Sequence, residues 1–187
     1  VDAFILAKLE EKGLQPAPPA DKRTLIRRAT FDLIGLSPTP EEIDAFLKDD
    51  SDRAYEKAVE RLLASPHYGE RWGRHWMDVW RYSDWDGYGA EIRESKPHIW
   101  RWRDWIVESL NADRPYDRMV VEMLAADEVA PTDEDALRAT GFLVRNYKML
   151  SRETWMQDVV EHTSKGFLAL TVNCSQCHDH MYDPVLH

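Results

Sequence analysis

The sequence lacks long apolar runs and has very little cysteine. No stretch approaches the roughly 20 consecutive apolar residues that a transmembrane helix needs, and the mean hydropathy is -0.57, so we expect no insertion into a membrane. The two cysteines, Cys174 and Cys177, fall within one five-residue motif, which leaves none for a separate structural disulfide. Alternating runs with glycine-rich hairpin turns are also missing, which predicts little sheet.

Basic residues are fewer than acidic residues in this chain. The chain has 34 acidic and 24 basic residues and a formal net charge of -10. A polyanion such as nucleic acid would be repelled by this field, so nucleic acid is excluded as an expected partner. An acidic surface can instead steer basic partners, redox proteins among them.

Apolar residues follow helical spacing along most of the chain, which predicts a mainly α fold. With 187 residues and 43% hydrophobic composition, we expect a single compact helical domain over residues 1–187. Thr39, Pro40 and Glu42 match a capping box with proline at the first helical position. Ser65-Pro66 should close the helix expected over 51–63, and residues 86–89 should form a break after the helix expected over 75–82. The other expected helices cover 4–9, a segment that begins near Asp21, 40–46, 97–110, 115–124 and 153–170.

The motif Cys174-Ser175-Gln176-Cys177-His178 is typical of covalent haem attachment. Two thiols three positions apart can each bond a haem vinyl group, while the next imidazole reaches the iron from one face. The motif therefore predicts one haem c near the C-terminal end, with thioethers at Cys174 and Cys177 and His178 as the proximal ligand. The second ring nitrogen of His178 needs an acceptor, and Asp183 or the carbonyls around Pro184 are the nearest in sequence.

Two other chemistries can use these residues. Zinc could take sulfur and nitrogen ligands from Cys174, Cys177, His178 and His180, although four ligands would crowd one tight loop and zinc sites usually draw a second pair from a distant segment. A dithiol redox centre would use Cys174 and Cys177, but the motif follows a predicted helix rather than opening one, so it lacks the N-terminal dipole that activates such thiols.

The sixth haem ligand decides between electron transfer and small-molecule chemistry. The principal candidates are His162, on the predicted helix that leads into the motif, and His75. Since His180 lies two residues past His178, we expect its side chain to bond a propionate, Asp179 or Asp183 instead of reaching the opposite haem face. The wider set of candidates is His67, His180, Met149, Met156 and Met181.

The region from 68 to 105 holds seven of the eight tryptophans, interleaved with arginines. The plainest interpretation is that Trp72, Trp76, Trp80, Trp100 and Trp105 fill a helical core. Aromatic rings beside a haem would also lower the local dielectric, and exposed rings can bind sugars by stacking. Among the arginines, Arg74 and Arg81 are candidates for bonding haem propionates, with surface ion pairs as the alternative.

The C-terminal segment Cys174 to Pro184, CSQCHDHMYDP, closely resembles the C-x-x-C-H-D-H-K-[FY]-D-P signature of a planctomycete cytochrome-like domain family of unknown function. Met181 stands where that family usually has lysine. Upstream segments at 4–9, 25–28, 31–36, 65–72, 74–76 and 166–171 also look like blocks of this family, so the resemblance covers nearly the whole chain.

The resemblance implies an exported bacterial protein, periplasmic or at the cell surface, in which such a domain accompanies other cytochrome-like or carbohydrate-associated modules. The chain begins at Val1 without a signal segment and ends nine residues after His178, so we expect it to be a fragment of a longer protein.

Three functional hypotheses follow from the motif and the resemblance. The first is a monohaem electron carrier that exchanges electrons with redox proteins or neighbouring cytochrome modules. The second is a haem enzyme or gas-binding domain with an open sixth position. The third is a carbohydrate-associated structural module holding haem or zinc. Because no nucleophile and base pairing stands out in the sequence, we favour a carrier over a catalyst.

Overall fold

The computed structural model describes residues 1–88, 92–95, 97–145 and 151–187, and they are mainly helical, as predicted. Contacts within the chain divide it into two compact units, Val1–Arg61 and Leu62–His187. Each unit is described by itself below. No helix in the described ranges is long and apolar enough to cross a bilayer.

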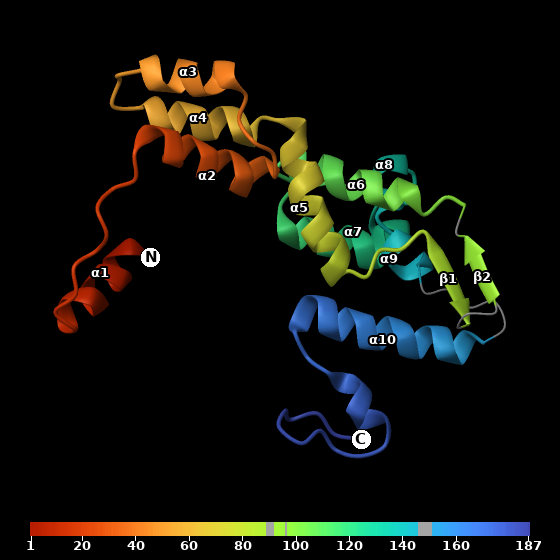
Figure 1. Ribbon diagram of the computed structural model, residues 1–187. Helices are drawn as coiled ribbons and strands as arrows, with labels where there is room; N and C mark the ends of the chain where they lie inside the picture. Colours follow the sequence, from red (N-terminus) through yellow and green to blue (C-terminus); the bar gives the residue numbers. More distant parts are fainter. Residues whose placement is uncertain (89–91, 96, 146–150) are drawn as a thin grey trace. The chain divides into compact units, whose positions relative to one another are not determined.

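The first unit contains α1 (Asp2–Glu11), α2 (Lys22–Ile34), α3 (Pro40–Lys48) and most of α4 (Ala54–Leu63). Its small core joins α2, α3 and α4 (Figure 1) through Ile26, Phe46, Ala54 and Ala58. The predicted capping box is confirmed, because the Thr39 side chain accepts from the Glu42 N–H while the Glu42 carboxylate accepts from the Thr39 N–H. These bonds satisfy amides that the first turn of α3 leaves without a helical partner.

The second unit carries the cysteine motif. Its elements are α5 (Pro66–Val79), β1 (Trp85–Tyr88), β2 (Ile92–Ser95), α6 (Trp100–Asn111), α7 (Tyr116–Val129), α8 (Glu134–Arg138), α9 (Gly141–Val144), α10 (Arg152–Leu168) and the 3-10 helix η1 (Val172–Gln176). The strands β1 and β2 pair antiparallel. The short helices α8 and α9 were not predicted, since four or five residues are too few to show a helical period.

Two boundaries differ from the sequence prediction. Ser65-Pro66 ends α4 and also opens α5, because proline fits the first helical position and the Ser65 hydroxyl accepts from the His67 N–H. The helix predicted over 75–82 therefore starts at Pro66 and ends at Val79. The predicted break at 86–89 does follow the helix, but its described residues 86–88 belong to β1.

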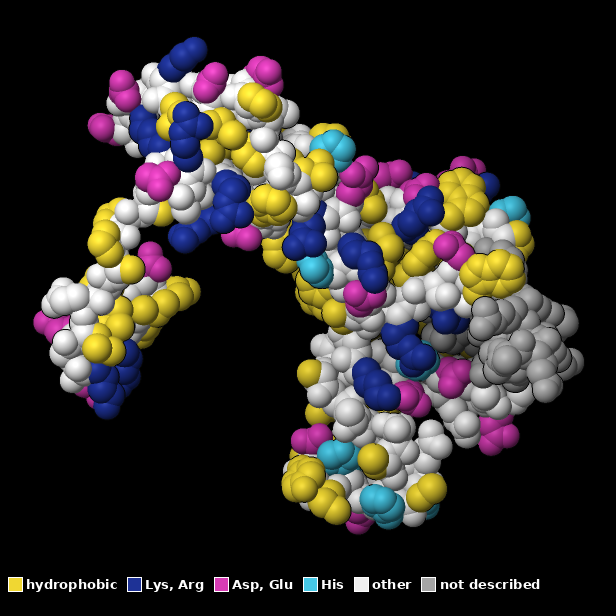
Figure 2. Space-filling view, viewed as in Figure 1, with side chains coloured by type: hydrophobic (Ala, Val, Ile, Leu, Met, Phe, Trp, Pro, Cys, Tyr) yellow, Lys and Arg dark blue, Asp and Glu magenta, His cyan; other side chains and the backbone are white. Residues whose placement is uncertain are grey.

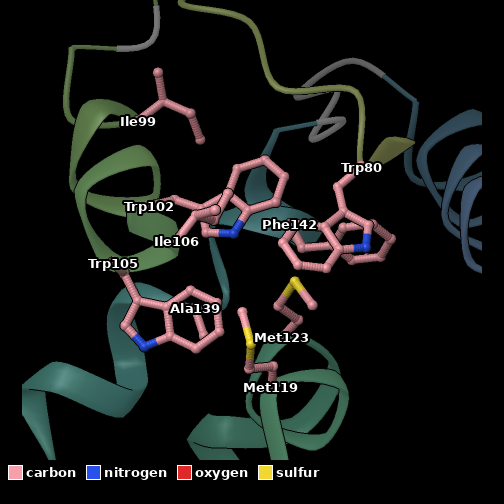
Figure 3. Packing of buried hydrophobic residues seen from close by; sticks show 9 residues of the cluster. All are labelled: Trp80, Ile99, Trp102, Trp105, Ile106, Met119, Met123, Ala139 and Phe142. Atoms are coloured by element: carbon pink, nitrogen blue, oxygen red, sulfur yellow. The ribbon is translucent and has the colours of Figure 1, made fainter. Parts of the chain in front are cut away.

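A tryptophan-rich cluster forms the core of the second unit (Figure 3). Trp80, Trp102 and Trp105 are each at most 2% exposed, and α7 contributes Met119 and Met123 to the same cluster. The prediction that tryptophans fill the core is confirmed for Trp80 and Trp105.

Other tryptophans of the region lie nearer the surface. Trp76 is partly buried and stacks on Trp80 with 4.9 Å between ring centroids. Trp100, in contrast, is 43% exposed and Trp72 37% exposed, so the core prediction is wrong for Trp100 and overstated for Trp72. The reason is helical phase, because Trp102 and Trp105 turn inward and leave Trp100 on the outer side of α6.

Candidate functional site

Helix α10 delivers the chain into the cysteine motif. Ser151 caps its start by accepting from the Thr154 N–H. Its end is set by Ala169, whose backbone is left-handed with φ of 56°, a conformation that terminates helices. The chain then turns into η1, which contains Cys174. The prediction of a long helix over 153–170 is confirmed to within two residues at its end.

The cysteine thiols are exposed and form no disulfide. Cys174 lies within η1, and Cys177 is its C-terminal cap, donating its N–H to the Cys174 carbonyl at 3.3 Å. Since a 3-10 helix has three residues per turn, positions 174 and 177 follow one another along the same side. Histidine side chains also lie at the surface of this C-terminal segment (Figure 2). Two accessible thiols on one side of a turn can be bonded by a single planar group.

The hydrogen bond of His178 fixes which of its ring nitrogens is free. Nδ1 lies 2.7 Å from the backbone carbonyl oxygen of Asp179. A carbonyl oxygen only accepts, so Nδ1 carries the proton and donates. The neutral ring then has its lone pair on Nε2, which is the arrangement of a metal-ligating histidine. The acceptor is the Asp179 carbonyl, not Asp183 or a carbonyl near Pro184 as the sequence suggested.

His180 has the opposite tautomer. Its Nδ1 lies 3.2 Å from the N–H nitrogen of Tyr182 and 2.8 Å from that of Asp183. Because both of these groups donate, Nδ1 carries the lone pair and Nε2 carries the proton, which faces the Thr171 hydroxyl at 3.2 Å. The backbone N–H of His180 also donates to the Val185 carbonyl at 2.9 Å. His180 therefore closes the turn after the motif with both ring nitrogens engaged.

An apolar groove of about 640 Å³ lies between α10 and η1. Its volume is within the ordinary range for a small-molecule or cofactor site. Helix α10 contributes residues one turn apart, and η1 contributes the residues that directly precede each cysteine. Six of the lining residues are Arg152, Met156, Val160, Val172, Asn173 and Gln176. The groove thus borders the turn that carries the two thiols.

The two rival chemistries find less support in this geometry. Within the described ranges, no three histidine, cysteine or acidic side chains converge as a metal cluster would require. Zinc could recruit His180 only by breaking the bonds that close the turn. A dithiol centre would require activation of the thiol, yet Cys174 lies in the middle of a five-residue 3-10 helix, without the N-terminal dipole of an α-helix.

His162 lies on the other side of α10. Residues 156 and 160 line the groove. At 100° per residue, His162 points about 120° away from residue 156 and about 160° away from residue 160. Its side chain is buried, with Arg81 Nη1 2.6 Å from Nδ1 and 2.8 Å from Nε2. A guanidinium only donates, so the accepting lone pair of His162 is taken by Arg81. The structure therefore does not bring this predicted distal ligand to the motif.

Stability should depend on pH through His162. Burial, and next the positive charge of Arg81, lower the pKa of His162 from its ordinary 6.5, while Glu161 and Asp158 oppose the shift and Lys165 adds to it. Below about pH 6.5 the His162 side chain binds a proton in the unfolded chain but not in the folded chain. The free energy of unfolding therefore decreases as the pH is lowered, by at most about 1.4 kcal/mol per pH unit.

The test of this pH dependence is urea unfolding at pH 7.5 and pH 5.5. We expect the His162→Gln variant, which keeps an acceptor for Arg81 but cannot titrate, to lose less stability between the two pH values than the wild type does. Equal losses in the two proteins would contradict the assignment.

The remaining predicted site residues lie outside the groove. His75 is exposed on α5 against the Trp72 ring, and His67 bonds Glu70 with 2.7 Å between Nδ1 and Oε2. Met181 is 76% exposed in the C-terminal turn. Met149 lies outside the described residues.

The two predicted propionate ligands are also engaged elsewhere. Arg74 pairs with Asp78 one turn away on α5, and Arg81 holds His162. Neither arginine lines the groove beside the motif. Sequence proximity to tryptophan was the only signal for them, and it does not determine which surface an arginine faces.

Comparison with protein families gives a match over the whole chain. Residues 1–187 match the model of PSCyt2, described as a protein of unknown function (DUF1549). The chain belongs to this family. The searches of curated proteins and of solved structures give no match. The match confirms family membership over residues 1–187. The family description assigns no activity, and the cytochrome character and the signature expected from the resemblance stay predictions.

Proposed function

We propose that this chain is a monohaem c-type cytochrome domain that carries electrons. The observation that supports it best is the motif turn, in which Cys174 and Cys177 are exposed on one side and His178 has its Nδ1 proton bonded to a carbonyl. This combination offers two thioether positions and a free imidazole nitrogen within five residues. The apolar groove beside the turn has room for a cofactor.

Each residue of the turn has a distinct role in this proposal. Cys174 and Cys177 hold the haem covalently, and His178 ligates its iron through Nε2. The carbonyl of Asp179 orients the ring and raises its basicity as a ligand. His180 keeps the following segment folded back on Thr171. When bound, the haem supplies an iron that alternates between ferrous and ferric states.

The negative charge of the chain indicates what kind of redox partner it would bind. A formal net charge of -10 would steer a basic redox protein toward the domain and speed the encounter at low salt. We infer an exported location, periplasmic or at the cell surface, from the kind of haem attachment proposed and from the family resemblance. Neighbouring cytochrome modules of the same polypeptide would be natural donors or acceptors.

The decisive experiment is export of this chain in a bacterial host that attaches haem to c-type cytochromes. We expect the purified protein to be red, to show a c-type spectrum and to keep one haem on the Cys174 to Cys177 peptide after denaturation, by mass spectrometry. Metal analysis should find about one iron per chain. A colourless protein with zinc in place of iron, or an unmodified peptide under conditions that mature a control cytochrome, would overturn the proposal.

A further inference from the structure

We propose that the groove between α10 and η1 seats the haem and that Met156 supplies its second axial ligand. This inference rests on the proposed function and adds the ligand on the other side of the iron. The groove is bordered by Asn173 and Gln176, each directly preceding a haem-attaching cysteine. A group tethered at Cys174 and Cys177 therefore starts at the edge of this groove.

Exposed apolar side chains of α10 line the groove. Met156 is 53% exposed and Val160, one turn further along α10, is 59% exposed. Both belong to the lining, together with Val172 from η1. Two large apolar side chains on adjacent turns are unfavourable to leave in water. A haem tethered by the chain's own cysteines would cover them.

Met156 has the right donor for the second ligand. Thioether sulfur ligates haem iron in electron carriers, where it raises the reduction potential. Of the candidates that the sequence offered, Met156 is the one within the described residues that lines the groove. His162 faces the other side of α10 and bonds Arg81, while both nitrogens of His180 are engaged in the turn.

Arg152 provides a cation at the same groove. It lies one turn before Met156 on α10 and is exposed, and within the described ranges it forms no ion pair. A guanidinium in this place suits a haem propionate, which it can bond with two N–H groups. Two carboxylates also line the groove. Glu161 is balanced by Lys165, and Glu153 remains without such a partner in the described structure.

The test compares Met156→Leu with the matched control Met181→Leu, both in the exported, haem-bearing chain. Leucine keeps the volume and apolar character of methionine without its sulfur donor. We expect the ferric wild type and the Met181→Leu protein to show the charge-transfer band of methionine sulfur on haem iron, and Met156→Leu to lose it. The reduced Met156→Leu protein should also bind carbon monoxide readily, and its reduction potential should fall.

The outcomes separate this inference from the function on which it rests. Failure of the wild type to acquire covalent haem overturns the proposed function. Three results obtained with covalent haem present overturn Met156 as the ligand and leave the proposed function intact. In these results the charge-transfer band survives in Met156→Leu, disappears in Met181→Leu, or is missing from the wild type. The yield of covalent haem in Met156→Leu shows whether that variant folds.

Discussion

Replacement of both Cys174 and Cys177 by serine should abolish covalent haem completely. Serine is close to cysteine in size, and both thiols are exposed and outside any disulfide, so the fold should persist while both thioether positions are lost. Each single variant keeps one thiol and should retain a single thioether at reduced yield. The measurement is the mass of the denatured chain, with far-ultraviolet circular dichroism to verify that the helices are intact.

Ser175→Ala is the matched control for the cysteine variants. It changes the same turn but neither thiol, and the Ser175 hydroxyl is buried with no hydrogen-bond partner among the described residues. Removal of an unpaired buried hydroxyl should leave stability the same or slightly higher. We expect full haem attachment in this variant. Covalent haem in the double serine variant would contradict the proposed attachment site.

Trp105→Ala should destabilise the second unit by about 3–5 kcal/mol. Trp105 is fully buried in the cluster of Figure 3, among side chains from several helices, and Arg114 lies 5.4 Å from its ring centroid. Alanine would leave a large cavity between α6 and α7 and would remove the cation–π contact. The measurement is the free energy of unfolding from a urea titration followed by circular dichroism.

Trp105→Phe distinguishes packing from the indole N–H. That N–H has no hydrogen-bond partner among the described residues, so its loss should cost nothing, and phenylalanine retains a ring under Arg114. We expect this variant to lose less than half of what Trp105→Ala loses. Equal losses would mean that the pocket depends on the full width of the indole, and a negligible loss in Trp105→Ala would contradict the assignment of Trp105 to the core.

The sequence predicted those parts of the fold that depend on interactions between residues close together in the chain. The capping box at Thr39 and Glu42 is such a case, since both of its bonds join residues three apart. The long helix before the motif is another, because its period is repeated over several turns. The strands β1 and β2 were missed because four-residue segments show no clear alternation, and their pairing with each other is a tertiary property.

The candidate site was only partly predictable. The spacing of Cys174, Cys177 and His178 is visible in the sequence, but the hydrogen bond that assigns the proton of His178 joins it to a backbone carbonyl, which no side-chain pattern reveals. The groove had a weak signal, since Met156 and Val160 are four apart on a helix and would share one side. In the sequence, His162 is at least as near to the cysteine motif as Met156 and Val160 are. Only the helical phase of α10 places its side chain on the opposite side of the helix from the groove.

The closed turn at His180 has a consequence for which substitutions this position tolerates. The His180 side chain presents an acceptor, Nδ1, one bond beyond Cγ, to the backbone N–H groups of Tyr182 and Asp183. The side-chain oxygen of asparagine occupies the same place relative to its own backbone as Nδ1 of histidine. We expect His180→Asn to keep the turn, whereas His180→Lys should lose it, because lysine has a nitrogen side chain but no acceptor. In this turn the second histidine of the C-x-x-C-H-D-H sequence thus acts through the position of its acceptor nitrogen.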